Sequence, residues 1–325
     1  MLPSVVAAPL HLSLVLPCFN EASNVDAMHD AVAAAFENCG FAYEMVFVDD
    51  GSSDGTFQKL KALRARSPQS ITVVRFSRNF GKESAIYAGL RHAKGDYVTL
   101  IDADLQQPPA LALEMARFLD ENEDFDCVAA FQEHRNEGKL TAFLKNCFYK
   151  LMNRITEIEF VQGASDFRTM RRSMAEAILS LGEHNRFSKG IFSWVGFNTH
   201  YIPYRAAARH TGATKFGTRK LFKLAFEGIV SFTTVPLRLS AFAGVLSALA
   251  ALVYMLVVII QKLAWGIDVP GYATLAVLIL FLGGLQLLGL GVLGEYLAKT
   301  YVESKRRPIY LAREVLEGKP AKGGE

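Results

Sequence analysis

Residues 97–104 read Tyr97-Val98-Thr99-Leu100-Ile101-Asp102-Ala103-Asp104, an apolar run that ends in two carboxylates. The run predicts a short buried β-strand, because it is rich in β-branched and aromatic residues and carries no charge. Two carboxylates one residue apart at the exit of such a strand suit a hard divalent cation, which prefers oxygen ligands. Because such cations commonly hold phosphates, the stretch predicts a site for a phosphate-bearing substrate.

The segments around this strand alternate between strand-like and helix-like patterns. We expect further strands at residues 12–16, 43–48, 71–76 and 126–131, and helices at residues 22–38, 55–66, 83–93 and 109–121, with Asp54 as the N-cap of the second helix. Alternation of this kind is typical of an α/β fold with a mostly parallel sheet covered by helices on both faces.

Polar residues follow three of the predicted strands. They are Asn20-Glu21, Asp49-Asp50 and Asp102-Ala103-Asp104. Any one of these could be ordinary turn chemistry, but ligands of such sheets bind beyond the carboxyl ends of the strands, so all three together favour a site. The sequence has no Gly-x-Gly-x-x-Gly after the first strand and no Gly-Lys-Ser/Thr phosphate loop, which argues against a dehydrogenase and a P-loop nucleotidase.

Two long segments in the last third of the chain contain no charged residue. Residues 239–260 and 269–294 each exceed the ~20 residues that a helix needs to cross a bilayer. Buried core helices are the alternative, but those keep a polar face. Basic residues flank the pair, whereas the connecting loop holds only Lys262 and Asp268, so the positive-inside rule predicts that both termini are cytoplasmic. The flanking residues are Arg219, Lys220, Lys223, Arg238, Lys299, Lys305, Arg306 and Arg307.

These patterns divide the chain of 325 residues into four parts. We expect a catalytic domain at residues 1–217, an amphipathic helix in the membrane interface at 218–238, a transmembrane hairpin at 239–297, and a C-terminal helix and tail at 298–325. Glycines in the second span would permit close helix approach, so a homo-oligomer is one reading and merely tilted or flexible helices are the other. The net charge of +3 is too small to suggest a nucleic-acid partner.

Six motifs in the first part carry a resemblance to a known family. They are Leu16-Pro17-Cys18-Phe19-Asn20-Glu21, Val48-Asp49-Asp50-Gly51-Ser52-Ser53-Asp54-Gly55-Thr56, Ser77-Arg78-Asn79-Phe80-Gly81-Lys82, Asp102-Ala103-Asp104-Leu105-Gln106-Gln107-Pro108-Pro109, Ser165-Asp166-Phe167-Arg168 and Asn185-Arg186-Phe187-Ser188-Lys189-Gly190. As a set they resemble the family 2 glycosyltransferases with a type A, Rossmann-like fold. More narrowly, the chain is similar to the polyprenyl-phosphate glycosyltransferases, which include dolichyl-phosphate mannose synthase and bacterial bactoprenol glucosyltransferases.

The resemblance implies an inverting transfer of one sugar from a nucleotide diphosphate sugar to a polyprenyl phosphate. A glucose on UDP and undecaprenyl phosphate at the cytoplasmic face of a bacterial inner membrane are the first expectation. N-acetylglucosamine, galactose, mannose and an aminoarabinose stay open. The rival functions are a processive polysaccharide synthase, whose Gln-x-x-Arg-Trp motif and additional spans are missing from the sequence, and a non-catalytic membrane scaffold, against which the intact acidic motif argues.

The resemblance also implies roles for individual residues. A Mg²⁺ or Mn²⁺ ion would be held by Asp104, Gln106 and Asp102. The nucleotide sugar would contact Pro17, Asn20, Glu21, Asp49, Asp102, Ala103 and Asp104, while Asp50 would order its loop. The acceptor phosphate calls for positive side chains, for which Arg135, Lys145, Arg209 and Lys215 are the candidates.

The catalytic candidates are Asp102, Asp166 and Arg168. The family analogy offers Asp166 as a general base. A phosphate monoester, however, has a second pKa of about 6 and is already mostly dianionic at neutral pH, so it needs a base less than a hydroxyl acceptor does. Asp166 could instead orient the acceptor phosphate through Arg168 or position the sugar, and both readings stay open at this point.

Overall fold

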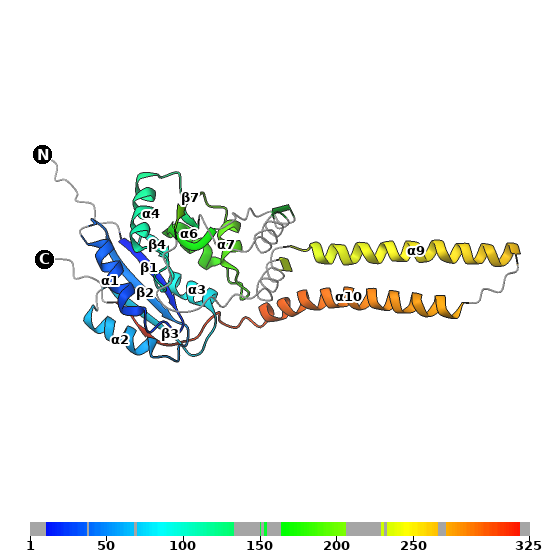
Figure 1. Cartoon of the computed structure of the whole chain (residues 1–325), viewed down its shortest axis with the longest axis horizontal. Helices are drawn as coiled ribbons and strands as arrows, with labels where there is room; N and C mark the ends of the chain where they lie inside the picture. Colours follow the sequence, from blue (N-terminus) through cyan, green and yellow to red (C-terminus); the bar gives the residue numbers. More distant parts are fainter. Residues whose placement is uncertain are drawn as a thin grey trace. The chain divides into compact units, whose positions relative to one another are not determined.

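The computed structural model describes residues 11–37, 39–67, 70–132, 150, 153–154, 164–205, 229–230, 233–265 and 271–318. Within this part of the chain, the strands form one eight-stranded sheet in the order β7-β5-β6-β4-β1-β2-β3-β8. Helices precede or follow most of the strands (Figure 1). The α/β class that the sequence predicts is therefore confirmed.

The centre of the sheet is parallel. It consists of β1 (His11–Cys18), β2 (Ala42–Asp49), β3 (Ile71–Phe76) and β4 (Tyr97–Leu100). β1 pairs in parallel with β2 and β4, and β2 pairs in parallel with β3. The register places Cys18 beside Asp49 and Asp49 beside Arg75, so the carboxyl ends of these strands meet at one edge.

Helices cover the two faces of this parallel core. α1 (Val25–Phe36), α2 (Thr56–Arg66) and α4 (Pro109–Glu121) contribute to one apolar cluster with Leu14 and Leu16 of β1. Because successive strand residues point to opposite faces, Val15 faces the other side, where α3 (Lys82–His92) packs. A Cβ at Gly89 of α3 would lie 2.1 Å from Cγ1 of Val15, so only glycine permits this approach.

The elements of the parallel core match the sequence predictions closely. β3 and α4 have the predicted bounds, and the other strands and helices differ by a few residues at their ends. The N-cap prediction was wrong by one position: α2 begins at Thr56 and its N-cap is Gly55, which has a φ of 91°. Asp54 still serves this helix end, because its Oδ1 accepts the Thr56 backbone N–H at 3.1 Å.

Three strands on one side of β4 include an antiparallel one. β6 (Ala164–Arg171) lies between β4 and β5 (Cys127–Gln132) and is antiparallel to both, while β7 (Thr199–Tyr204) is parallel to β5. Leu100 of β4 pairs with Arg168 of β6. Asp102 is two residues beyond Leu100 and Asp166 is two residues before Arg168, so this register brings the two acids to the same level of the sheet. α6 (Arg172–Ser180) and α7 (Ser188–Trp194) complete this side.

The C-terminal segment contradicts the predicted helix within residues 298–325. The helix α10 ends at Ser304, Arg306 has a φ of 47°, and residues Ala312–Leu316 form the strand β8. β8 pairs antiparallel with β3 and closes the edge of the sheet there, and residues from Pro308 onward group with the catalytic unit. Helix-forming side chains in this segment are overridden because the unpaired edge of β3 offers a full row of backbone partners.

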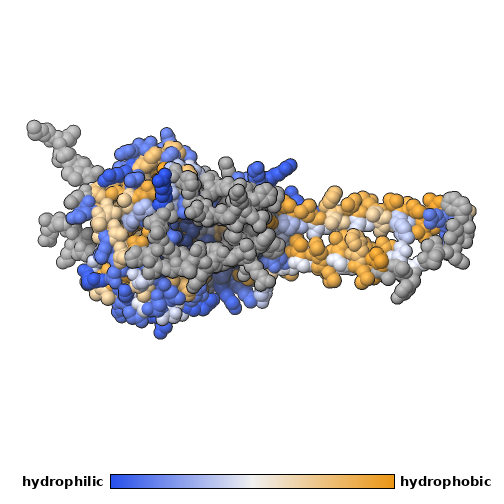
Figure 2. Space-filling model, viewed as in Figure 1, coloured by the Kyte–Doolittle hydropathy of each residue, from blue (hydrophilic) through white to orange (hydrophobic). Residues whose placement is uncertain are grey.

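The second compact unit contains two long helices joined in a hairpin, α9 (Val235–Trp265) and α10 (Tyr272–Ser304). Both are long and apolar enough to cross a membrane, and no part of their most apolar windows is buried. Figure 2 shows their surface as mostly hydrophobic, with a few white and blue residues between the apolar ones. The predicted interfacial helix at 218–238 lies mostly outside the described residues, and its last four positions belong to α9.

Candidate active site

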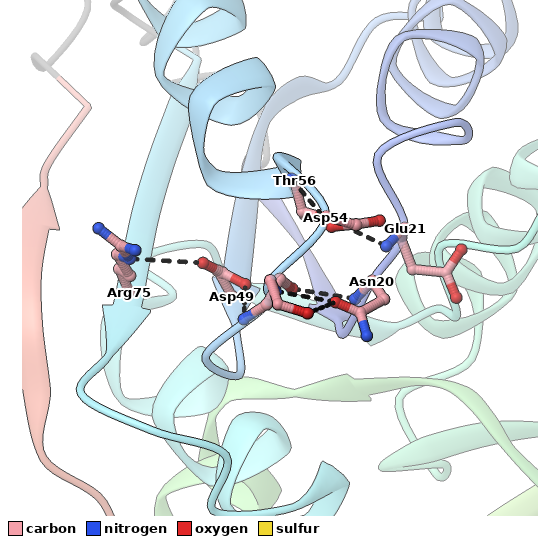
Figure 3. Close-up of polar contacts among 8 residues, drawn as sticks. Asn20, Glu21, Asp49, Asp54, Thr56 and Arg75 are labelled. Carbon is pink, nitrogen blue, oxygen red and sulfur yellow. Dashed lines mark hydrogen bonds and ion pairs between the residues drawn. The ribbon is translucent and has the colours of Figure 1, made fainter.

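The loops after β1 and β2 interlock through side-chain contacts to backbone (Figure 3). Oδ1 of Asn20 accepts the Ser53 N–H at 2.9 Å, and the Asn20 N–H donates to Oγ of Ser52 at 2.9 Å. The Glu21 N–H donates to Oγ1 of Thr56 at 2.9 Å. Asn20 has a φ of 57°, a left-handed conformation that asparagine tolerates better than most residues. Asn20 and Glu21 therefore belong to one rigid wall of the site.

Asp49 lies at the bottom of this wall. Its side chain is 0% exposed, and its Oδ1 accepts the Ser52 N–H at 3.0 Å. Its Oδ2 lies 3.8 Å from Nε of Arg75, and among the described residues neither atom has a hydrogen-bond partner. The Arg75 guanidinium packs over the Phe57 ring at 4.3 Å. A buried acceptor and a buried donor thus lie close together without satisfying each other, as a site for a polar ligand edge would.

Asp50 has a different environment. Its Oδ1 accepts the Phe80 N–H at 2.6 Å and its Oδ2 accepts the Gly81 N–H at 2.9 Å. Burial raises the pKa of Asp50, and these two N–H groups oppose that rise. Asp50 was expected to order its own loop, but both of its carboxylate oxygens hold a neighbouring segment, residues 77–82, which we call the Lys82 segment.

Asp102 is held in place by Gln107. The Asp102 N–H donates to Oε1 of Gln107 at 2.8 Å, and Nε2 of Gln107 donates to Oδ2 of Asp102 at 3.1 Å. Gln107 is itself buried. Two hydrogen bonds to the same residue fix both the backbone and the carboxylate of Asp102, so Gln107 is a positioning residue that the sequence analysis did not identify.

The Lys82 ammonium bridges the two acids that the β4–β6 register brings together. Its Nζ lies 2.7 Å from Oδ1 of Asp102 and 3.0 Å from Oδ2 of Asp166. The three side chains, with Pro17 and Gln107, line one narrow crevice. Lys82 is both the last residue of the Lys82 segment and the first residue of α3.

The charges in this cluster shift one another's ionisation. Burial raises the pKa of Asp102 and Lys82 opposes that rise. Burial also acts to raise the pKa of Asp166, but nearby positive charges, chiefly Lys82 and Lys189, have the larger effect. The pKa of Asp166 is therefore below the ordinary value of a carboxyl group. Burial alone would lower the pKa of Lys82, yet the two carboxylates raise it well above the ordinary value for lysine. The raised pKa of Lys82 and the lowered pKa of Asp166 both favour the charged forms, an ammonium beside a carboxylate.

The turn after β4 presents the remaining acid of the motif. The Gln106 N–H donates to Oδ1 of Asp104 at 3.2 Å, and Leu105 between them has a φ of 61°, which is rare for a residue with a Cβ. Strained residues of this kind gather at ligand sites. Ala103 is buried, so a contact from it to a donor would come from its backbone.

The carboxylates at this turn suit a divalent cation that also binds the phosphates of a substrate. Among the described residues, no three His, Cys, Asp or Glu side chains form a cluster that could hold a metal alone. Asp104 lies close enough to raise the pKa of Asp102, so two carboxylates share this turn. Mg²⁺ is usually held by one or two carboxylates together with substrate phosphates, and the residues present fit that pattern.

A second motif is anchored next to Lys82. Oε2 of Glu83 accepts the Ser188 N–H at 2.9 Å and also the Ser188 hydroxyl. This contact ties the start of α7 to the start of α3 and brings Lys189 into electrostatic range of Asp166. In the sequence analysis, residues 185–190 had no role beyond their part in the family resemblance. In the structure, this motif lies beside the acidic cluster.

Arg168 does not take the position that a relay from Asp166 would need. Its guanidinium packs over the Phe192 ring at 3.7 Å, and Nη2 donates to the Ser165 carbonyl at 3.2 Å. Among the described residues, the ion pair that Asp166 makes is with Lys82. A route from Asp166 through Lys82 is therefore closer to the geometry than one through Arg168.

The structure thus brings together most of the predicted donor and catalytic residues. Pro17, Asp102 and Asp166 line the crevice, while Asn20, Glu21 and Asp49 form the wall beside it. The predicted acceptor residues Arg135, Lys145, Arg209 and Lys215 lie outside the described residues. Lys82 and Gln107 were missed as site residues. The available signal for Lys82 was a lysine that follows a single glycine, Gly81, shortly after a predicted strand.

Two family models match separate parts of this chain. The family model described as glycosyl transferase family 2 matches residues 13–179, and the model described as the GtrB C-terminal hairpin matches residues 235–300.

Relatives of similar length share about two fifths of the sequence. The putative glycosyltransferase CsbB of Bacillus subtilis is 39% identical over 303 residues, which cover 93% of this chain and 91% of the relative. The prophage bactoprenol glucosyl transferase homolog of Escherichia coli is 40% identical over 306 residues, or 94% of this chain and 99% of the relative. The bactoprenol glucosyl transferase of Shigella phage SfV is 41% identical over 304 residues, or 94% and 98%.

The acidic turn after β4, the interlocked loops after β1 and β2 and the apolar hairpin are all found in segments that these matches cover. The fold is that of a type A glycosyltransferase with two apolar helices after the catalytic domain. The chain belongs to glycosyl transferase family 2 and is a membrane-associated glycosyltransferase with a GtrB-type C-terminal hairpin.

Proposed function

We propose that this enzyme transfers a single glucose from UDP-glucose to undecaprenyl phosphate, with inversion at the anomeric carbon. The observation that carries the proposal is the shared ion pair of Asp102 and Asp166 with Lys82 at the carboxyl edge of the sheet. It sets a positive side chain where a nucleoside diphosphate would leave, beside the turn that carries Asp104. The names of the relatives, bactoprenol glucosyl transferases, supply the sugar and the acceptor of the proposal.

The nucleotide end of the donor would lie against the wall formed by the β1 and β2 loops. The unpartnered Oδ2 of Asp49 can accept a hydrogen bond from the imide N–H of uracil, and Nε of Arg75 can donate to a neighbouring carbonyl. A base with an acceptor at the imide position would leave the buried carboxylate unsatisfied, which costs about 1–3 kcal/mol. This donor and acceptor pair favours UDP over a cytidine nucleotide.

Asp104, Asp102 and Gln106 would hold a Mg²⁺ or Mn²⁺ ion together with the diphosphate. Such an ion, when bound, supplies charge stabilisation for the departing diphosphate. Lys82 adds a second positive charge on the same side, and its pKa keeps it protonated throughout the neutral range. Gln107 keeps the Asp102 carboxylate oriented toward Lys82.

The acceptor phosphate would be its own nucleophile. One of its oxygens forms a bond to the anomeric carbon while the bond from that carbon to the diphosphate oxygen breaks, and the electron pair of the broken bond leaves with UDP. No proton has to be removed, because the phosphate monoester is already dianionic. The lowered pKa of Asp166 makes it a weak base at neutral pH, so we assign it to positioning Lys82 and the substrates. Arg135, Lys145, Arg209 and Lys215 remain the proposed acceptor contacts.

The deciding experiment is transfer of label to undecaprenyl phosphate from a panel of radiolabelled nucleotide sugars, with Mg²⁺, with Mn²⁺ and with EDTA. We expect one metal-dependent lipid product, from UDP-glucose. A product from another donor would overturn the sugar and leave the reaction class. No product from any donor with folded protein would favour the scaffold, and long products would favour a polysaccharide synthase.

The proposed orientation has the catalytic domain and both termini in the cytoplasm of a bacterial cell. Replacing the native cysteines and introducing Asp268→Cys should place a thiol outside the inner membrane. We expect this thiol to react with a membrane-impermeant maleimide in spheroplasts, whereas a cysteine at Glu114 should react only after lysis. The opposite pattern would reverse the topology.

A further inference from the structure

The strand β8 ends its pairing with β3 where the Lys82 segment begins. Val73, Val74, Arg75 and Phe76 of β3 pair with residues of β8, with an irregularity between Arg75 and Phe76. One further backbone bond extends beyond the strand: the Ser77 N–H donates to the Leu311 carbonyl at 2.9 Å. The first residue of the Lys82 segment is therefore fixed by the chain that follows the membrane hairpin.

Aromatic contacts continue this connection into the segment. Tyr310 stacks on Phe76 with ring centroids 4.8 Å apart and an interplanar angle of 22°. Phe76 is 1% exposed and packs edge-on against Phe80, with centroids 5.7 Å apart. Tyr310 also packs against Tyr87 of α3 at 6.4 Å. Tyr310 thus contacts residues before and after Lys82 in the sequence.

The opposite side of the Lys82 segment is also held tightly. Phe80 and Gly81 donate their N–H groups to Asp50. A Cβ at Gly51, which has a φ of 69°, would lie 2.5 Å from the backbone carbon of Arg78. The segment therefore runs between the Asp50 loop and the aromatic pair Tyr310 and Phe76, and it has little freedom to shift.

We infer that Tyr310 is a positioning residue for Lys82. It acts through Phe76, Phe80 and Tyr87 to keep the Lys82 ammonium between Asp102 and Asp166. A long, flexible lysine side chain needs a fixed backbone if its Nζ is to stay within 2.7 and 3.0 Å of two separate carboxylates. Tyr310 lies six positions after Ser304, the last residue of α10. The segment that follows this helix therefore supports the Lys82 ammonium.

This inference rests on the proposed function only for its kinetic readout. In the sugar-transfer assay, Tyr310→Ala should lower kcat by about 10- to 10²-fold, because small displacements of a catalytic group have effects of that size. KM for the nucleotide sugar should change less, since the Asp49 wall is untouched. Tyr310→Phe should restore the rate, because the contacts are made by the ring. Arg313→Ala, an exposed position of β8, is the matched control and should behave as wild type.

A double mutant separates positioning from general stability. In a Lys82→Met background there is no ammonium to position, so adding Tyr310→Ala should change kcat by less than about 2-fold, whereas independent sites would multiply. Full multiplication of the two effects would overturn the inference. So would Tyr310→Phe being as slow as Tyr310→Ala.

Hydrogen exchange gives a readout that needs no activity. Peptides covering residues 76–82 should exchange faster in full-length Tyr310→Ala than in wild type, Tyr310→Phe or Arg313→Ala, while peptides of α1 stay unchanged. Unchanged exchange in residues 76–82 would overturn the inference even if the enzyme transfers sugar as proposed. Faster exchange in a protein that transfers no sugar would uphold the positioning contact and reject the proposed function.

Discussion

Asp50, which follows β2, and Asp102, which follows β4, bind different kinds of partner. Asp50 accepts two backbone N–H groups, whereas Asp102 shares the Lys82 ammonium with Asp166. Backbone donors are fixed by the fold, while a lysine side chain can change partner when a substrate arrives. The difference separates Asp50, which has a structural role, from Asp102 and Asp166, which we expect to take part in the reaction.

The partners of both acidic groups come from three consecutive residues. Phe80 and Gly81 supply the N–H groups for Asp50, and Lys82 supplies the ammonium. A short segment thus connects the loop after β2 with the crevice beside β4 and β6. Changes to either acid or to this segment should distinguish structural from functional roles.

The largest effect is expected at the acidic turn after β4. Asp104→Ala should reduce transfer by at least about 10³-fold, because loss of a metal ligand removes several kcal/mol of charge stabilisation. The fold should persist, since Asp104 lies in a turn outside the core. Initial rates at saturating metal would test this, with Glu114→Ala, an exposed acid of α4, as control. Turnover near wild type would reject the metal assignment.

The second largest effect is expected from removal of the Lys82 ammonium, which Asp102 and Asp166 share. Lys82→Met should slow transfer by about 10²- to 10³-fold, the usual effect of deleting one preorganised electrostatic group. Lys82 opposes the rise in the pKa of Asp102, so that pKa should rise further without it. Because activity needs the Asp102 carboxylate, the acid limb of the pH–rate profile should move to higher pH. An unmoved limb would mean that Lys82 does not control Asp102.

Asp166 should have a smaller effect than a general base would. Asp166→Asn should cost about 10- to 10²-fold, well below the ~10⁴-fold that removal of a general base can reach. The reason is its lowered pKa, which leaves it a poor proton acceptor at neutral pH. Single-turnover rates at saturating acceptor would measure the loss. A reduction of four decades or more would restore the base role.

The smallest effect on chemistry is expected at Asp50. Asp50→Asn keeps one acceptor and sets an amide donor against a backbone N–H, so the free energy of unfolding should fall by about 1–3 kcal/mol. The loss of activity should stay below that of Lys82→Met, because the ammonium remains. Thermal unfolding in detergent together with kcat would test both statements. Wild-type stability combined with a rate as low as that of Lys82→Met would place Asp50 among the functional acids.

Local pattern sufficed for the parallel core. An apolar run predicted β4, and apolar residues spaced three and four apart predicted α1, where Val25, Met28, Val32 and Phe36 are buried. β8 shows the limit of this reasoning. Its residues favour a helix locally, but pairing with the free edge of β3 satisfies more backbone groups than one more surface helix would.

The site divides in the same way. The acids Asp49 and Asp102 stood out because polar residues follow three predicted strands at matching positions, whereas Asp166 was identified only through the family resemblance. Lys82 and Gln107 did not, because a lysine or glutamine at a loop is usually a solvated side chain. Their roles appear only when distant segments meet: Gln107 folds back on Asp102, and Lys82 reaches two acids that are far apart in the sequence.

The sequence by itself determined the α/β class, the apolar hairpin and the acidic turn after β4, because each is written in residues that are neighbours along the chain. Only the tertiary structure decided that β6 runs antiparallel beside β4, that β8 returns from the hairpin to β3, and that Lys82 joins Asp102 to Asp166. The physical reason is that strand register and ion pairing depend on contacts between distant segments, whose geometry no local pattern contains.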